Sequence, residues 1–99
     1  MLYAIMGEDA PDSAMKRRDA RPAHLERVEQ LKNEGRLVIA GPHPAIDSAD
    51  PGPAGFTGSL IIAEFPSLED ARNWVSQDPY AIRGVFARVT VKPFRQVLP

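Results

Sequence analysis

The stretch Ala20–Val28, ARPAHLERV, contains His24, one of only two histidines in the chain. Pro22 is best tolerated at the first position of a helix, so we predict that a helix begins there and that His24 lies in its first turn. The free N–H groups and the macrodipole at a helix N-terminus disfavour a cationic imidazolium. Because a general base needs a neutral imidazole, His24 is a candidate base. The alternative is a structural histidine beside an apolar stripe.

Arginines just before this histidine could bind an anionic substrate. A guanidinium holds a carboxylate or phenolate by paired hydrogen bonds, so Arg17, Arg18 and Arg21 are candidate ligands. Arg21 is the strongest of them, because it lies three residues before His24 and so near the same side of a helical turn. The alternative for such a run is a solvated helix face.

Three further residues are candidates for a substrate pocket. The Ser59 hydroxyl could donate a hydrogen bond, and Gly58 before it would allow close backbone approach. Tyr80 could form an aromatic wall, whereas core packing or a subunit interface is the more usual role for Phe56. A Gly-Ser pair is equally a plain entry from a loop into a strand.

Metal and cofactor chemistry have little support in the sequence. His43 lies four residues before Asp47, but no ligand-spacing motif accompanies the pair, so we predict no metal site and assign His43 to a loop. The chain has no Gly-rich phosphate loop, no G-x-S-x-G elbow and no dinucleotide fingerprint. We therefore expect no organic cofactor.

The composition is that of one ordinary globular domain of 99 residues. A net charge of -1 argues against a dedicated nucleic-acid or membrane-surface binder, which concentrates Lys and Arg on one face. The absence of cysteine excludes disulfides and thiol catalysis. The apolar run at the N-terminus is too short for a signal peptide or a membrane span, so a cytoplasmic location is expected.

Hydrophobic periodicity predicts four strands and two helices. The strands are expected at Leu2–Met6, Arg36–Gly41, Ser59–Phe65 and Val85–Val91. After a short turn at Ser13–Arg18, one helix is expected over Pro22–Glu34, ended by a left-handed Gly35, and another begins at the capping residue Ser67 and is broken by DPY. The Pro- and Gly-rich segment between the second and third strands is expected to be an irregular loop, Pro42–Gly58.

This order, βαββαβ, predicts an α+β, ferredoxin-like fold with a four-stranded antiparallel sheet and both helices on one face. The first three strands have apolar residues at consecutive positions, so they look apolar on both faces. Two helices leave one face uncovered. We therefore expect a homodimer formed through that sheet face.

Several segments together resemble the YciI (YCII-related) family: RPAHL, EGRLVIAGP, AGFTGS, IAEFPSLEDA, DPY, GVF and VKPF, in this order. The resemblance implies a single YCII-related domain over residues 1–99, a ferredoxin-like fold and dimers like the α/β-barrel dimers of muconolactone isomerases. It also implies an active site centred on a histidine and an aspartate, which fall on His24 and on Asp78 of DPY. An aspartate before proline is also a common turn initiator. The family that the chain resembles includes members linked to the breakdown of chlorinated aromatic compounds, as dehydrochlorinases.

These observations favour a small-molecule enzyme without a cofactor, in which His24 is the acid/base and Asp78 fixes its tautomer. The expected reaction is proton abstraction from a small anionic or aromatic substrate, followed by elimination or isomerisation, with hydrolysis also open. Arg17, Arg21, Gly58, Ser59 and Tyr80 would bind the substrate. The alternative is a non-catalytic dimer that binds a small acidic metabolite through His24 and Arg21.

Overall fold

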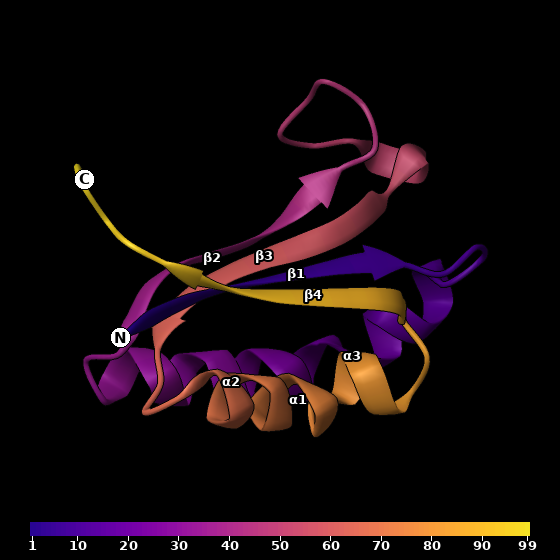
Figure 1. Cartoon of the computed structure of the whole chain (residues 1–99). Helices are drawn as coiled ribbons and strands as arrows, with labels where there is room; N and C mark the ends of the chain where they lie inside the picture. The colour runs from indigo at the N-terminus through magenta and orange to yellow at the C-terminus, as the bar shows by residue number, and fades with distance from the viewer.

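A four-stranded antiparallel sheet carries all the longer helices on one face in the computed structural model, which describes residues 1–99 (Figure 1). The elements, in chain order, are β1 (Leu2–Asp9), α1 (Ala14–Asn33), β2 (Leu37–Pro44), the short 3₁₀ helix η1 (Gly52–Ala54), β3 (Phe56–Glu64), α2 (Leu68–Ser76), α3 (Pro79–Ile82) and β4 (Phe86–Phe94). The strand order is β2-β3-β1-β4. The predicted βαββαβ order is confirmed, with the one-turn helix α3 added after α2.

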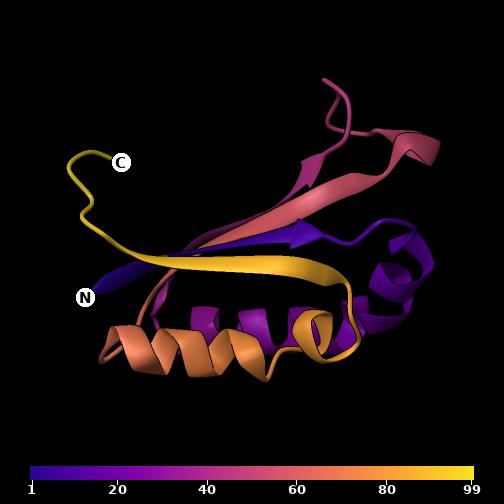
Figure 2. The same cartoon turned by 45° about the vertical axis from the view of Figure 1, so that its right-hand side comes forward.

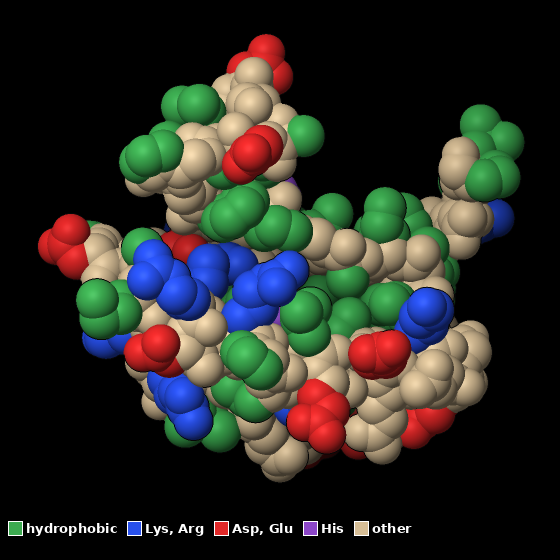
Figure 3. All heavy atoms as spheres, turned by 180° about the vertical axis from the view of Figure 1, so that it is seen from behind, with side chains coloured by type: hydrophobic (Ala, Val, Ile, Leu, Met, Phe, Trp, Pro, Cys, Tyr) green, Lys and Arg blue, Asp and Glu red, His purple; other side chains and the backbone are tan.

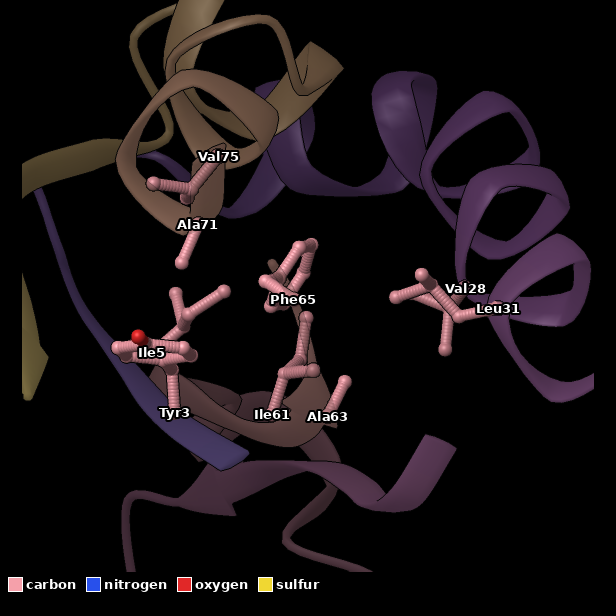
Figure 4. Packing of buried hydrophobic residues seen from close by; sticks show 9 residues of the cluster. All are labelled: Tyr3, Ile5, Val28, Leu31, Ile61, Ala63, Phe65, Ala71 and Val75. Carbon is pink, nitrogen blue, oxygen red and sulfur yellow. The ribbon is translucent and has the colours of Figure 1, made fainter. Parts of the chain in front are cut away.

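The hydrophobic core lies between the sheet and the helices. Ile5 of β1 pairs with Ile61 of β3, so both side chains point to the same face of the sheet, where they meet the helices (Figure 4). A cluster from both layers fills this space (Figure 4): Tyr3, Ile5, Val28, Leu31, Ile61, Ala63, Phe65, Ala71 and Val75. The predicted N-cap of α2 is confirmed, because the Ser67 side chain accepts a hydrogen bond from the Asp70 N–H.

The division of the first helical region into a turn and a later helix was wrong. Helix α1 runs without a break over Ala14–Asn33, and Pro22 lies inside it. A proline in a helix interior removes one hydrogen bond, but here the residues on both sides of it share one buried stripe. The stripe consists of Arg17, Ala20, His24, Val28 and Leu31. Burial of this stripe holds the turns before Pro22 in the helix. His24 therefore lies in the interior of α1 and not in its first turn. Leu25 is three residues before Val28 but does not belong to this stripe, and it is 40% exposed.

The segment predicted as one irregular loop is partly strand. Strand β2 continues through Pro44 and β3 already begins at Phe56, with register shifts near His43. Prolines are tolerated because β2 is an edge strand, where a missing N–H breaks no inner ladder. The irregular part is therefore shorter than expected, and it projects beyond the sheet (Figure 1). Gly35 has the predicted left-handed conformation, with φ 73°.

The second face of the sheet has no helix on it (Figure 2). Ala4, Ile62 and Ile39 lie side by side in neighbouring strands and point away from the core, because their neighbours Ile5 and Ile61 point into it. Ile39 is 56% exposed and Phe94, at the end of β4, is 37% exposed. This open face, formed by Leu2, Ala4, Met6, Ile39, Leu60, Ile62 and Phe94, is the uncovered apolar surface that the strand patterns predict. None of the helices is long and apolar enough to cross a bilayer.

The close approach of β1 and β3 at Gly58 gives a stability prediction. A Cβ atom built on Gly58 would lie 2.1 Å from the Gly7 carbonyl oxygen, which is backbone and can move little. A Cβ on Gly41, in β2 of the same sheet, would have nothing within 4 Å. We expect Gly58→Ala to lower the free energy of unfolding by at least about 2 kcal/mol, and Gly41→Ala to change it by less than about 0.5 kcal/mol. Urea unfolding of both variants checks this, and equal losses would contradict it.

Candidate active site

The centre of the site is the buried carboxylate of Asp78, which lies between α2 and α3 and is 1% exposed. As the N-cap of α3, it accepts the Tyr80 backbone N–H at 3.0 Å through Oδ2. The same oxygen lies 2.7 Å from Nδ1 of His24, and Oδ1 accepts from Nη1 of Arg27 at 2.8 Å. Three donors from two helices therefore satisfy this carboxylate, as a buried anion requires.

The Asp78 contact decides which nitrogen of His24 is free. An ionised carboxylate only accepts hydrogen bonds, so Nδ1 carries the proton when the ring is neutral. Nε2 has no hydrogen-bond partner in the protein, and no fully buried side-chain nitrogen lacks a partner, so Nε2 is open to solvent although His24 is only 7% exposed. The helix-terminus reason for a neutral ring was wrong, because His24 lies in the interior of α1. Asp78, rather than the helix dipole, sets its environment.

Tyr80 forms a platform under the histidine. Its ring stacks on the His24 ring with centroids 3.9 Å apart and an angle of 11° between the planes, while Phe86 meets it edge-on at 5.5 Å. Burial raises the pKa of the Tyr80 phenol above its ordinary value, and the positive charges of Arg17 and Arg21 oppose part of this rise. The phenol is therefore neutral at physiological pH. The stacking of the two rings holds the imidazole in one orientation.

Arg17 is buried and already paired. Its Nε donates to Asp9 at 2.8 Å, and Nη2 donates to Asp9 at 3.1 Å and to the Ser59 hydroxyl at 2.8 Å. Its guanidinium carbon also lies 4.7 Å from the Tyr80 ring centroid. Because the Ser59 oxygen accepts from Arg17, its own O–H remains free to donate. These contacts join β1, α1, β3 and α3 at one end of the sheet.

A cavity of about 290 Å³ opens beside these groups. Its polar side is formed by Arg17, Arg21, His24, Ser59 and Tyr80, and its apolar side by Leu25, Val28, Leu37, Ala40, Gly41, Pro42 and Ile61. Seen from behind, basic side chains gather below the projecting loop, next to apolar ones (Figure 3). Arg21 makes no ion pair within the protein, in contrast to Arg17. The cavity therefore borders one cation that is free for a ligand.

The structure brings five of the sequence-predicted residues to one cavity, where Asp78 reaches it only through His24, and it places others elsewhere. Gly58 is not part of the cavity lining; its lack of a side chain serves the close β1–β3 contact. His43 lies on exposed β2, and no group of three His, Asp or Glu side chains is close enough to hold a metal ion. Sequence reasoning missed Asp9 and Arg27. Arg27 follows His24 by three residues, a spacing that places it beside the histidine on α1.

The raised pKa of Tyr80 gives a pH prediction. The unfolded chain releases this phenolic proton near its ordinary pKa of about 10, before the folded protein does, so the stability is fully present below about pH 10 and falls as the pH rises through the folded pKa. Urea unfolding between about pH 8 and pH 11 should therefore show a steeper loss in the wild type than in Tyr80→Phe, which has no phenol. Parallel pH curves for the two proteins would contradict the burial effect.

Comparison with known proteins identifies the family of this chain. The family model described as the YCII-related domain matches residues 1–95. The chain is 58% identical over 97 residues to Protein YciI of Escherichia coli O6:H1, and 50% identical over 97 residues to an uncharacterized protein of Haemophilus influenzae; each alignment covers 98% of this chain and 99% of the relative. The solved structure of 5-chloro-2-hydroxyhydroquinone dehydrochlorinase (TftG) from Burkholderia phenoliruptrix, in complex with 2,5-dihydroxybenzoquinone, matches with a TM-score of 0.84 and 30% identity, over 96% of this chain and 94% of that one. The chain therefore belongs to the YCII-related domain family.

Proposed function

We propose that this protein is a small-molecule enzyme in which His24 is the general acid/base and Asp78 its orienting partner. One observation carries the proposal: the buried Asp78 carboxylate occupies Nδ1 of His24 and leaves Nε2 open at the cavity. A purely structural histidine would have both ring nitrogens bonded to buried protein groups. The solved relative at 30% identity is named as a dehydrochlorinase, which supports an enzymatic role for this fold.

The cavity favours a substrate with a single ring or a short chain and a negative charge. Its volume of about 290 Å³ is at the lower end of the range for ligand pockets. Arg21 would hold a carboxylate or phenolate, and the Ser59 hydroxyl would donate a second hydrogen bond. Leu25, Val28 and Ile61 would pack against the apolar part of the ligand. The bound 2,5-dihydroxybenzoquinone in the structure of the relative is a molecule of this size class.

The proposed reaction begins with proton transfer to Nε2 of His24 from a carbon next to a carbonyl or in an activated ring. In an elimination, the C–H electron pair becomes a new double bond while the leaving group departs from the adjacent carbon with its own bonding pair. In an isomerisation, the imidazolium returns the proton to a different carbon. In a hydrolysis, Nε2 would instead take a proton from water while the water oxygen bonds to the substrate carbon; the bond to the leaving group then breaks, and the imidazolium returns the proton to that group. Asp78 stabilises the imidazolium in each case, and Arg21 stabilises negative charge that develops on the substrate.

A second candidate is a binding protein without turnover. It is favoured because Arg21, which has no ion pair, and the free nitrogen of His24 border the same cavity. These two groups alone could hold a carboxylate. Such a protein would bind small acids with a pH dependence and leave them unchanged. Turnover separates the two functions.

The test of the first candidate is His24→Asn, with His43→Asn as the matched control. We would incubate the protein with a panel of small phenols, hydroxyquinones and their chlorinated forms, and follow halide release and products by chromatography. If His24 transfers the proton, His24→Asn should lower turnover at least about 100-fold, whereas His43→Asn, on exposed β2, should keep it. Turnover in His24→Asn within about threefold of wild type would rule out this role. Binding without turnover in the wild type would favour the second candidate.

We also propose that the functional unit is a homodimer in which the open sheet faces pack together. The support is the continuous apolar surface on that face, including Ile39 at 56% exposed, and the absence of any helix over it (Figure 2). An apolar surface of this kind is larger than isolated monomers usually expose, and a second copy offers the complementary apolar face.

The dimer is tested by Ile39→Lys, with Ile82→Lys as the control. Ile82 is a still more exposed isoleucine, and it lies on α3, away from the open face. Sedimentation at about micromolar concentration should give a dimer for the wild type and for Ile82→Lys, and a monomer for Ile39→Lys, because a lysine there would have to be buried without a partner. An apolar interface should also persist in high salt. A monomeric wild type would contradict the proposal.

A further inference from the structure

Arg27 touches the other side of the carboxylate that binds His24. Its Nη1 donates to Oδ1 of Asp78 at 2.8 Å, whereas His24 is bound to Oδ2. The guanidinium carbon lies 4.3 Å from the Trp74 ring centroid, so the side chain is fixed between α2 and the carboxylate. Arg27 is not part of the cavity lining. It is thus held in place outside the cavity.

This position matters because two cationic groups share one anion. The Asp78 carboxylate, 1% exposed, attracts a proton to His24 when it has no other positive partner. Arg27 is always charged, and it neutralises the carboxylate and repels a second positive charge on the histidine beside it. A cation on the same carboxylate favours the neutral imidazole that a base needs at neutral pH, because an imidazolium has no free nitrogen lone pair.

We propose that Arg27 is a positioning residue that keeps His24 available as a proton acceptor by holding and neutralising Asp78. The value of this arrangement for catalysis rests on the proposed function of His24. The charge coupling between Arg27 and His24 does not. This coupling exists in the free protein and is measurable without a substrate.

The other charged groups around His24 do not replace Arg27. On its own helix, Arg17 is paired with Asp9, and Arg21 points to the cavity without an ion pair. From α3, the histidine meets Asp78 and the neutral phenol of Tyr80. The parts of β2 and β3 that line the same cavity contribute apolar residues and Ser59, but no charge. Among these groups, Arg27 alone is a cation in direct contact with Asp78 besides His24 itself.

The experiment is an NMR titration of the histidine ring signals in wild type, Arg27→Met, Arg27→Lys and Arg18→Met. Methionine keeps an apolar stem against Trp74 and removes the charge, lysine keeps the charge, and Arg18 is an exposed arginine of α1 without an ion pair. We expect the titration midpoint of His24 to rise by about one pH unit in Arg27→Met, by clearly less in Arg27→Lys, and not at all in Arg18→Met. The exposed His43 is the internal reference in every sample.

An unchanged His24 midpoint in folded Arg27→Met would overturn the inference, as would an equal rise in Arg18→Met, which would reflect net charge alone. If Arg27→Met does not fold, Arg27→Gln removes the charge while retaining an amide donor, and the same rise is expected. The outcome is independent of turnover. If the His24 midpoint shifts in Arg27→Met but His24→Asn remains active, the coupling is supported and the proposed function is rejected. If the midpoint does not shift but His24→Asn loses turnover, the coupling is rejected and the proposed function is supported.

Discussion

The structure around the cavity depends on one constraint, the need to satisfy a carboxylate that is almost completely removed from water. An unpaired buried anion is strongly destabilising, so Asp78 needs donors on both oxygens. The chain supplies them from the Tyr80 backbone, His24 and Arg27. Because the last two lie one turn apart on α1, the carboxylate fixes α1 against the junction of α2 and α3. The same contacts that stabilise this junction orient the imidazole.

A second consequence of burial is that neighbouring arginines have different roles. Arg17 and Arg21 are four residues apart on one helix and border the same cavity. Arg17 is held by Asp9 and Ser59 and packs near Tyr80, so it contributes positive charge from a fixed position. Arg21 has no ion pair. The cavity therefore borders one ion-paired arginine and one unpaired arginine.

Patterns of short range predicted much of the fold. The alternation of strands and the helical spacing of apolar residues gave the element order, and the capping residue Ser67 marked the start of α2 correctly. Pro22 misled the prediction of α1, because a local penalty was outweighed by burial of residues on both sides of it. The prolines of β2 misled the prediction of where this strand ends. A strand tolerates prolines when it lies at the edge of a sheet, and that position is a property of the whole sheet.

The site was predictable in part. His24, Arg17, Arg21, Ser59 and Tyr80 were identified by residue type, and they do meet at one cavity. Asp78 was predicted only from the resemblance to the YCII-related family, through the DPY segment. No local spacing could join it to His24, because 54 residues separate the two. Arg27 and Asp9 were missed, since an arginine on a charged helix and an aspartate at a strand end look like surface residues until tertiary contacts are known.

The most direct test of this account is the protonation of the His24 ring nitrogens, read from two-bond proton–nitrogen correlations in the wild-type protein at a pH where the ring is neutral. The account predicts that Nδ1, which is 2.7 Å from Asp78, carries the proton and that Nε2 has the shift of an unprotonated nitrogen. A proton on Nε2 of the neutral ring would contradict it, because the nitrogen at the cavity could then not accept one.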